Sequence, residues 1–128
     1  MKISRTGKAA IIINVFAILH AVTTYLLHMA EISDDLALSI LTITMLYLIA
    51  RLYYFPADVT AAIILIFCFA GFFLGTQGAK ILMASGSEFI IKYDHSISTF
   101  AVSQLLGWTM LFIVTRIRII KHDGRNAL

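Results

Sequence analysis

Residues 9–30 have the sequence AAIIINVFAILHAVTTYLLHMA, a run of 22 residues without a Lys, Arg, Asp or Glu. A helix of about 20 apolar residues crosses the hydrocarbon core of a bilayer. The run is longer than the apolar part of a secretory signal peptide, and no pair of small residues typical of a cleavage site follows it. We therefore expect residues 9–30 to form a membrane-spanning helix that is not cleaved.

Three more apolar runs of similar length follow, in residues 36–55, 59–82 and 97–119. Strands of a membrane barrel would be about half as long and would alternate apolar with polar side chains. The second run is stopped by Pro56, the only proline. Most links between the runs are short, and short links make consecutive helices antiparallel neighbours. The sequence thus predicts an all-α membrane protein, one domain over residues 1–128 that forms an antiparallel bundle of four transmembrane helices.

The composition agrees with a chain that has the lipid bilayer as its main partner. Hydrophobic residues make up 60% of the chain and charged residues 13%, against about 45–50% and about 25% in soluble globular proteins. The net charge of +3 does not indicate nucleic-acid binding, because the charges lie at the ends of the apolar runs and no basic surface interleaved with aromatic residues is present. The only cysteine, Cys68, lies within an apolar run and cannot form an intrachain disulfide.

The distribution of Lys and Arg residues predicts the orientation of the helices. Eight of the ten fall on one side of the membrane, namely Lys2, Arg5, Lys8, Arg51, Arg116, Arg118, Lys121 and Arg125. The other side has only Lys80 and Lys92, together with the acids Glu31, Asp34, Asp35, Glu88 and Asp94. Because positive residues favour the cytoplasm, we expect both termini there.

Small residues recur every four positions in the third run, at Gly71, Gly75 and Ala79. Such residues let two helix backbones approach closely, which favours helix association in lipid. Two interpretations are open. The seam either joins copies of the chain into a homo-oligomer through this helix, or it packs inside one chain, with the helix of residues 9–30 filling the groove through Ala17 and Ala21.

The first and fourth runs each carry a polar face that we expect to point into the bundle, because polar atoms facing lipid are costly. In the first run this face contains Asn14, Ala17, His20, Ala21, Thr24 and His28. In the fourth it contains Ser96, Thr99, Ser103 and Gly107, with Gln104 beside it. These side chains either hydrogen-bond between helices or form a ligand or proton site centred on His20. The candidate site residues are Asn14, His20, Thr24, His28, Ser103 and Gln104.

Acids and histidines gather on the side opposite the termini. Ser33 is expected to cap the second helix, with Asp34 and Asp35 in its first turn, where carboxylates meet the positive end of the helix dipole. The alternative is a patch that responds to cations or pH, since His28 and His95 are close to carboxylates in the sequence. Residues 88–93 form either a short amphipathic turn at the interface or a loop.

Neither a cofactor nor catalysis is expected. His20 and His28 lie two turns apart on one helix, whereas the axial ligands of a haem face each other across it, and no other span contains a histidine. The motifs of serine hydrolases, zinc peptidases and phosphate-binding loops are missing from the sequence. We therefore expect no enzyme activity, no metal and no cofactor.

Three stretches resemble the four-helix membrane module of some Bacteroidetes LytTR-type transcription regulators. They are residues 20–24 (HAVTT), residues 34–42 (DDLALSILT), and residues 95–100 (HSISTF) with Leu106-Gly107-Trp108. In such regulators a cytoplasmic DNA-binding domain follows the helices, and no such domain follows here. The chain would then be either a piece of a longer regulator or a module that acts through a partner.

The resemblance implies signal input without catalysis. We expect a non-enzymatic sensory or regulatory module of the bacterial inner membrane, which transmits a signal to a cytoplasmic or membrane protein partner. The alternatives are a small oligomeric pore or transporter-like protein, and an accessory subunit of a membrane complex.

Overall fold

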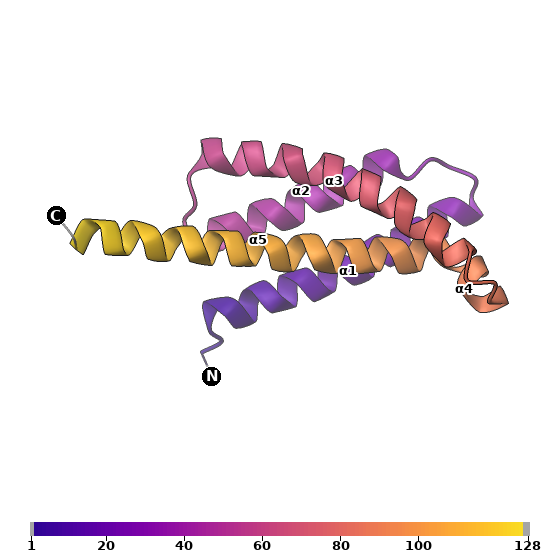
Figure 1. Ribbon diagram of the computed structural model, residues 1–128, viewed down its shortest axis with the longest axis horizontal. Coiled ribbons are helices and arrows are strands. Elements are labelled where there is room, and N and C mark those ends of the chain that lie inside the picture. The colour runs from indigo at the N-terminus through magenta and orange to yellow at the C-terminus, as the bar shows by residue number, and fades with distance from the viewer. Residues whose placement is uncertain (1, 127–128) are drawn as a thin grey trace.

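The computed structural model describes residues 2–126, including all their side chains except those of residues 91 and 118–126. The chain forms helices α1 (Arg5–Met29), α2 (Asp35–Leu52), α3 (Ala57–Met83), α4 (Glu88–Lys92) and α5 (Asp94–Asn126), and residues 2–126 contain no strand. Four of these helices are long and apolar enough to cross a membrane. They run antiparallel in chain order, so the predicted all-α four-helix fold is confirmed (Figure 1).

The helix ends differ from the predicted ones for local reasons. The first helix begins at Arg5 because Ser4 caps it, its Oγ accepting a 3.0 Å hydrogen bond from the backbone N–H of Gly7. Helix α2 ends at Leu52, before Pro56. Tyr54 then adopts a positive φ of 54°, a backbone conformation that is incompatible with a right-handed helix. Hydropathy locates the part of a helix that lies in lipid, whereas caps and turns determine where the helix begins and ends.

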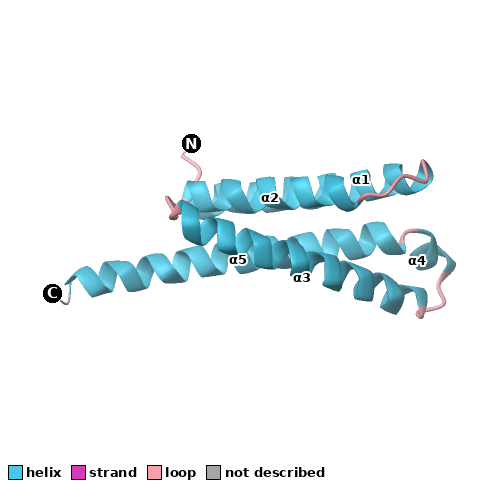
Figure 2. Ribbon diagram, turned by 90° about the horizontal axis from the view of Figure 1, so that it is seen from above, coloured by secondary structure: helices cyan, strands magenta, loops and turns pink. Residues whose placement is uncertain are grey.

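The four long helices form two layers, with α1 and α2 in one and α3 and α5 in the other (Figure 2). Helix α5 contacts each of the other three, and its contact with α1 is the most extensive in the bundle. Among the described residues α1 does not contact α3. Of the two diagonal pairs of helices, α2 and α5 are therefore in contact and α1 and α3 are not. Helix α5 is the central helix of the bundle.

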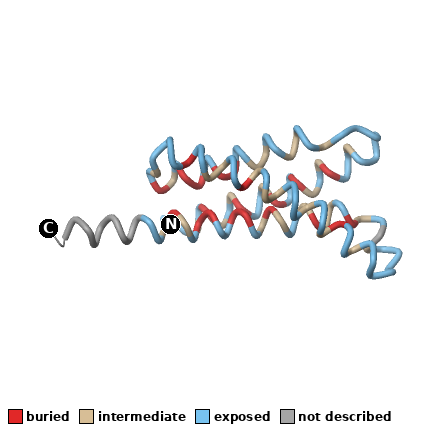
Figure 3. The backbone as a smooth tube through the Cα atoms, turned by 45° about the horizontal axis from the view of Figure 1, so that its top comes forward, coloured by how far each residue is buried: buried red, intermediate tan, exposed pale blue. Residues whose placement is uncertain are grey.

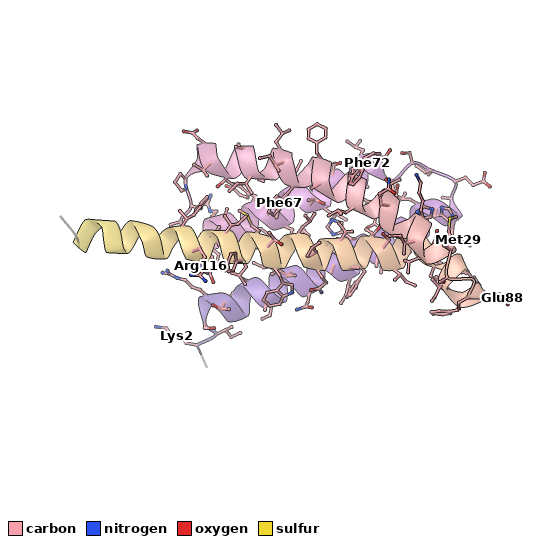
Figure 4. The ribbon with its side chains drawn as sticks, viewed as in Figure 1. Lys2, Met29, Phe67, Phe72, Glu88 and Arg116 are labelled. Carbon is pink, nitrogen blue, oxygen red and sulfur yellow. The ribbon has the colours of Figure 1, made fainter. Side chains whose placement is uncertain are left out.

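The two ends of the bundle are chemically different. At the end that carries both termini, here called the terminal end, Arg5 lies 5.4 Å from the centre of the Tyr54 ring, and Lys2 and Arg116 lie nearby (Figure 4). The opposite or distal end holds the α1–α2 link and the short helix α4, with Met29 and Glu88 (Figure 4). The residues predicted as a turn or a loop at positions 88–93 thus contain a helical turn.

A dry apolar core fills the terminal half of the bundle. Ile13, Met45, Ile49, Met110 and Val114 come from α1, α2 and α5, and all are 0% exposed. Many large apolar side chains lie on the outside instead, and Figure 3 shows that the outward positions of the helices are exposed. An apolar exterior of this extent requires lipid around it.

Helices α1 and α5 approach each other closely at Gly107. A Cβ atom placed there would lie 2.8 Å from both Cγ1 and Cγ2 of Ile13, a distance at which the atoms clash. Ile13 is itself fully buried, so it has no free space into which it can move. Only glycine therefore permits the observed distance between these two helices.

We predict that Gly107→Ala destabilises the fold by about 1–3 kcal/mol, the usual range for overpacking a tight core. Gly75→Ala is the matched control, because a Cβ atom at Gly75 would meet nothing within 4 Å. We expect this control to change the stability by less than about 0.5 kcal/mol. Reversible unfolding in mixed detergent micelles measures both, and equal effects of the two substitutions would contradict the prediction.

Candidate functional site

The distal half of the bundle contains a cavity of about 220 Å³ that is lined by α1, α2, α3 and α5. Asp34, Asp35 and His95 come from the distal ends of α2 and α5, so they form its mouth. His20 lines the cavity from the middle of α1, above the apolar core of the terminal half. The cavity thus has a mixed polar and apolar lining and lies in the distal half of the bundle.

His20 is held in one orientation by two hydrogen bonds. The side chain is 2% exposed, with Nδ1 2.6 Å from the carbonyl oxygen of Phe16 and Nε2 3.0 Å from Oγ1 of Thr42. A carbonyl oxygen can only accept, so Nδ1 carries the proton. In the neutral ring Nε2 then accepts the hydroxyl proton of Thr42, and this bond joins α1 to α2.

Three other hydroxyl groups on the cavity wall donate to backbone carbonyls of their own helices. Ser39 donates to the carbonyl of Asp35 (2.7 Å), Thr76 to that of Phe72 (2.8 Å), and Thr99 to that of His95 (2.7 Å). Each hydroxyl has one proton and two lone pairs. The groups that remain for the cavity are therefore hydrogen-bond acceptors.

Ser103 differs from these hydroxyls. It lines the cavity and is 3% exposed, yet its hydroxyl has no hydrogen-bond partner among the described residues. Its oxygen is open to the cavity, because the sealed side-chain atoms without a partner in the described residues are Thr24 Oγ1 and Asp94 Oδ2. A ligand or water in the cavity can therefore hydrogen-bond to Ser103. The neighbouring Ser98 donates instead to the carbonyl of Gly75 at 2.9 Å, which joins α5 to α3. Ser98 is not among the six candidate residues predicted from the sequence.

The carboxylates at the mouth are not used to cap α2. The prediction that Ser33 caps this helix is wrong, because the N-cap residue is Asp34, whose side chain makes no capping hydrogen bond. The Ser33 hydroxyl donates to Oδ2 of Asp35 at 3.3 Å. Both carboxylates therefore keep lone pairs that can bind a ligand.

The six candidate residues predicted from the sequence separate into four groups. His20 and Ser103 line the cavity, as a site centred on His20 requires. Thr24 is 1% exposed and its Oγ1 has no partner among the described residues, but it does not line the cavity. His28 is exposed at the distal end, and its ring centre lies 5.3 Å from that of His95.

Asn14 and Gln104 lie outside the bundle, so the expectation that Asn14 faces inward is wrong. Nε2 of Gln104 donates to Oδ1 of Asn14 at 2.9 Å, and Nε1 of Trp108 donates to Oε1 of Gln104 at 2.9 Å. At 100° per residue, Asn14 is about 120° around the helix from His20, at the edge of the predicted face. This amide pair is exposed on the α1–α5 surface.

The small residues of α3 pack against α5 or line the cavity. A Cβ atom at Gly71 would lie 3.0 Å from Cδ1 of Leu106, and Ala79 is 3% exposed. The tightest approach is at Gly78, where a Cβ atom would lie 2.5 Å from Oγ of Ser98. The alternative in which the first helix fills this groove is wrong, since α1 and α3 are not in contact. Self-association through α3 stays a prediction.

Within the described residues, no group of three or more His, Cys, Asp or Glu side chains is arranged to hold a metal ion. The nearest approach to such a group is Asp94 with His95, whose Oδ2 and Nε2 are 3.8 Å apart. Comparisons with protein-family profiles, with curated proteins and with solved structures give no match. The site must therefore be interpreted from its own geometry.

We predict that the His20–Thr42 hydrogen bond couples α1 to α2. In a double-mutant cycle of His20→Leu and Thr42→Val, measured by unfolding in detergent, the coupling free energy should be about 0.6 kcal/mol and at most about 1.7 kcal/mol. Thr44→Val is the control, because Thr44 is exposed on the same helix and donates to its own backbone at Ile40. Equal coupling of His20 to Thr42 and to Thr44 would contradict the assignment.

Proposed function

We propose that the chain is a non-enzymatic sensory or regulatory module of the membrane, in which the distal cavity receives the signal and α5 transmits it. The observation that supports this proposal is that one helix, α5, lines the cavity and also extends to the terminal end of the bundle. Helix α5 supplies His95, Thr99 and Ser103 to the cavity, and it contacts α1, α2 and α3. It also continues past the rest of the bundle at the terminal end (Figure 1).

The packing suggests which helices move when the cavity is filled. The α1–α5 contact is tight at Gly107 and acts as a fixed seam. The α3–α5 contact is interrupted by the cavity, where a Cβ atom added at Gly75 would meet no other atom within 4 Å. A ligand shifts an equilibrium only by its difference in affinity for the two states. A change in the spacing of α3 and α5 supplies such a difference, because both helices line the cavity.

The alternatives account for fewer of the observations. The apolar core below His20 leaves no polar path through the terminal half of one chain, so the alternative of a small oligomeric pore would need a path between copies of the chain. An accessory subunit of a membrane complex gains no specific support from the Asn14–Gln104 pair, because these amides already hydrogen-bond to each other, to Ala10 and to Trp108. A membrane partner of this kind is compatible with a sensory role, as is a cytoplasmic partner at the terminal end.

We further propose that the chain resides in the bacterial inner membrane with both termini in the cytoplasm, as the resemblance to LytTR-type membrane modules and the charge distribution suggest. The exposed Lys2, Arg5, Lys8 and Arg51 all lie at the terminal end. The distal mouth carries Asp34 and Asp35, which gives the two ends opposite charge. The cavity would then open toward the outside of the cytoplasmic membrane.

The signalling proposal is tested by filling the cavity with a side chain. Gly75→Leu should change the amide hydrogen exchange of the first turns of α3 and of the terminal part of α5 by at least about fivefold, the lower end of usual allosteric couplings. The control is Gln77→Leu, which places the same side chain at an exposed position of α3 that does not line the cavity. Liposomes containing the wild type should remain impermeable to ions.

Ion flux through the wild type would favour the pore alternative. Unchanged exchange at the terminal end in Gly75→Leu, with the distal end altered, would show that filling the cavity has no remote effect, and it would contradict the signalling proposal.

The orientation is tested separately with reporters fused after Leu128. Green fluorescent protein should be fluorescent at this position and alkaline phosphatase inactive, because the first folds in the cytoplasm and the second outside it. A fusion after Ser85, in the α3–α4 link at the distal end, should give the opposite pair of results. The reverse pattern at the two positions would refute the proposed orientation.

A further inference from the structure

The charged side chains that line the cavity are acidic. Asp34 and Asp35 lie at its mouth, and its described lining contains neither Lys nor Arg. The N-terminus of α2 lies beside them and carries a partial positive charge of about half an elementary charge. Two carboxylates exceed this partial charge, so the mouth retains a negative charge that attracts cations.

The polar groups deeper in the cavity are almost all acceptors. The protons of Ser39, Thr76 and Thr99 are donated to backbone carbonyls, which leaves only their lone pairs for a ligand. The hydroxyl of Thr42 donates its hydrogen bond to Nε2 of the neutral His20 ring. Among the serine and threonine hydroxyls that line the cavity, only that of Ser103 makes no hydrogen bond to another described residue, so it is free to bind a ligand. Such a lining matches a ligand group that only donates, and an ammonium group has three donors and no acceptor.

The size and walls of the cavity limit the rest of the ligand. Its volume of about 220 Å³ is smaller than the roughly 300–1,000 Å³ of pockets for drug-sized molecules. Leu38, Val102 and Leu106 supply apolar wall between the polar groups. A short hydrocarbon chain attached to the ammonium group would fill this part of the cavity.

We infer that the cavity binds a small primary ammonium compound, with the charge held between the Asp34 and Asp35 carboxylates and the hydroxyl oxygens, and the hydrocarbon part against the apolar wall. The same chemistry occurs in free alkylamines and in the ethanolamine headgroup of a phospholipid. The inference rests on the proposed function only in treating this cavity as the input site.

The test measures binding by calorimetry to the full chain in nanodiscs of phosphatidylcholine, whose headgroup has no N–H donor. The probes are n-butylammonium, its neutral analogue n-butanol, its anionic analogue butyrate, and tetramethylammonium, which has the charge without donors. We expect n-butylammonium to bind at least about tenfold more tightly than each of the other three, the gain from one charge-assisted hydrogen bond. Equal affinity for tetramethylammonium or butyrate would overturn the inference.

Two variants locate the binding in the cavity. Asp34→Asn combined with Asp35→Asn should weaken n-butylammonium binding at least about tenfold, and Ser103→Ala about threefold or more, as expected for charged and neutral partners respectively. Glu88→Gln is the matched control, because it removes one carboxylate at the distal end without lining the cavity. Unchanged affinity in the cavity variants would overturn the inference. If one of the two variants is unstable, the other one alone decides.

Nanodiscs that also contain phosphatidylethanolamine distinguish the two sources of the ligand. If the lipid headgroup occupies the cavity, n-butylammonium will bind more weakly in these discs than in phosphatidylcholine alone. If a free amine is the ligand, the two affinities will be equal. Both results support the ammonium class, and absence of binding in phosphatidylcholine contradicts it.

The outcome is separable from that of the signalling proposal. If n-butylammonium binds but leaves hydrogen exchange at the terminal end unchanged, the ligand class stands and signalling fails. If it does not bind, while Gly75→Leu alters exchange at the terminal end, signalling stands and the ligand class is wrong.

Discussion

The contact of Ile13 with the bare backbone of Gly107 determines how closely α1 and α5 pack, and the rest of the bundle is arranged around this pair. Because α5 lies against α1 along their most extensive contact, it can also reach α2 across the diagonal, which keeps α1 and α3 apart. In lipid no hydrophobic force drives helices together, so close approach and interhelical hydrogen bonds must supply the association. Close approach acts in both halves, at Gly107 in the terminal half and at Gly78 in the distal half. In the distal half the interhelical hydrogen bonds of His20 and Ser98 add to it.

The packing of the two halves explains why the cavity lies where it does. In the terminal half, Met45, Ile49 and Met110 fill the space between helices completely. In the distal half, smaller hydroxyl-bearing residues and Gly75 occupy the equivalent positions, and they leave space between α3 and α5. The hydrogen bond from His20 to Thr42 joins α1 to α2, and the one from Ser98 to Gly75 joins α5 to α3. The helices of each layer therefore stay joined in the distal half although it is not filled.

Hydropathy predicted the number and order of the spans because the bilayer requires runs of that length. It also indicated His20 and Ser103, since a polar side chain in the middle of a span is best satisfied inside the bundle. Which helix packs against each helix face could not be predicted, because this depends on the arrangement of all four helices in the bundle. The small residues of α3 meet α5 and not α1, and Asn14 lies just beyond the buried arc. The cavity itself is formed by four helices together, so no single stretch of sequence indicates it.

The unequal lengths of the spans have a consequence for the membrane around the protein. At a rise of about 1.5 Å per residue, the 18 residues of α2 reach about 27 Å and the 27 residues of α3 about 40 Å. The hydrocarbon core of a bilayer is about 30 Å thick. A short span is accommodated by thinning of the bilayer or by snorkelling side chains, and a long one by tilting, kinking or thickening, so α2 and α3 place opposite demands on the lipid beside them. Because these two helices face each other across the cavity, a change in bilayer thickness alters the angle between its walls.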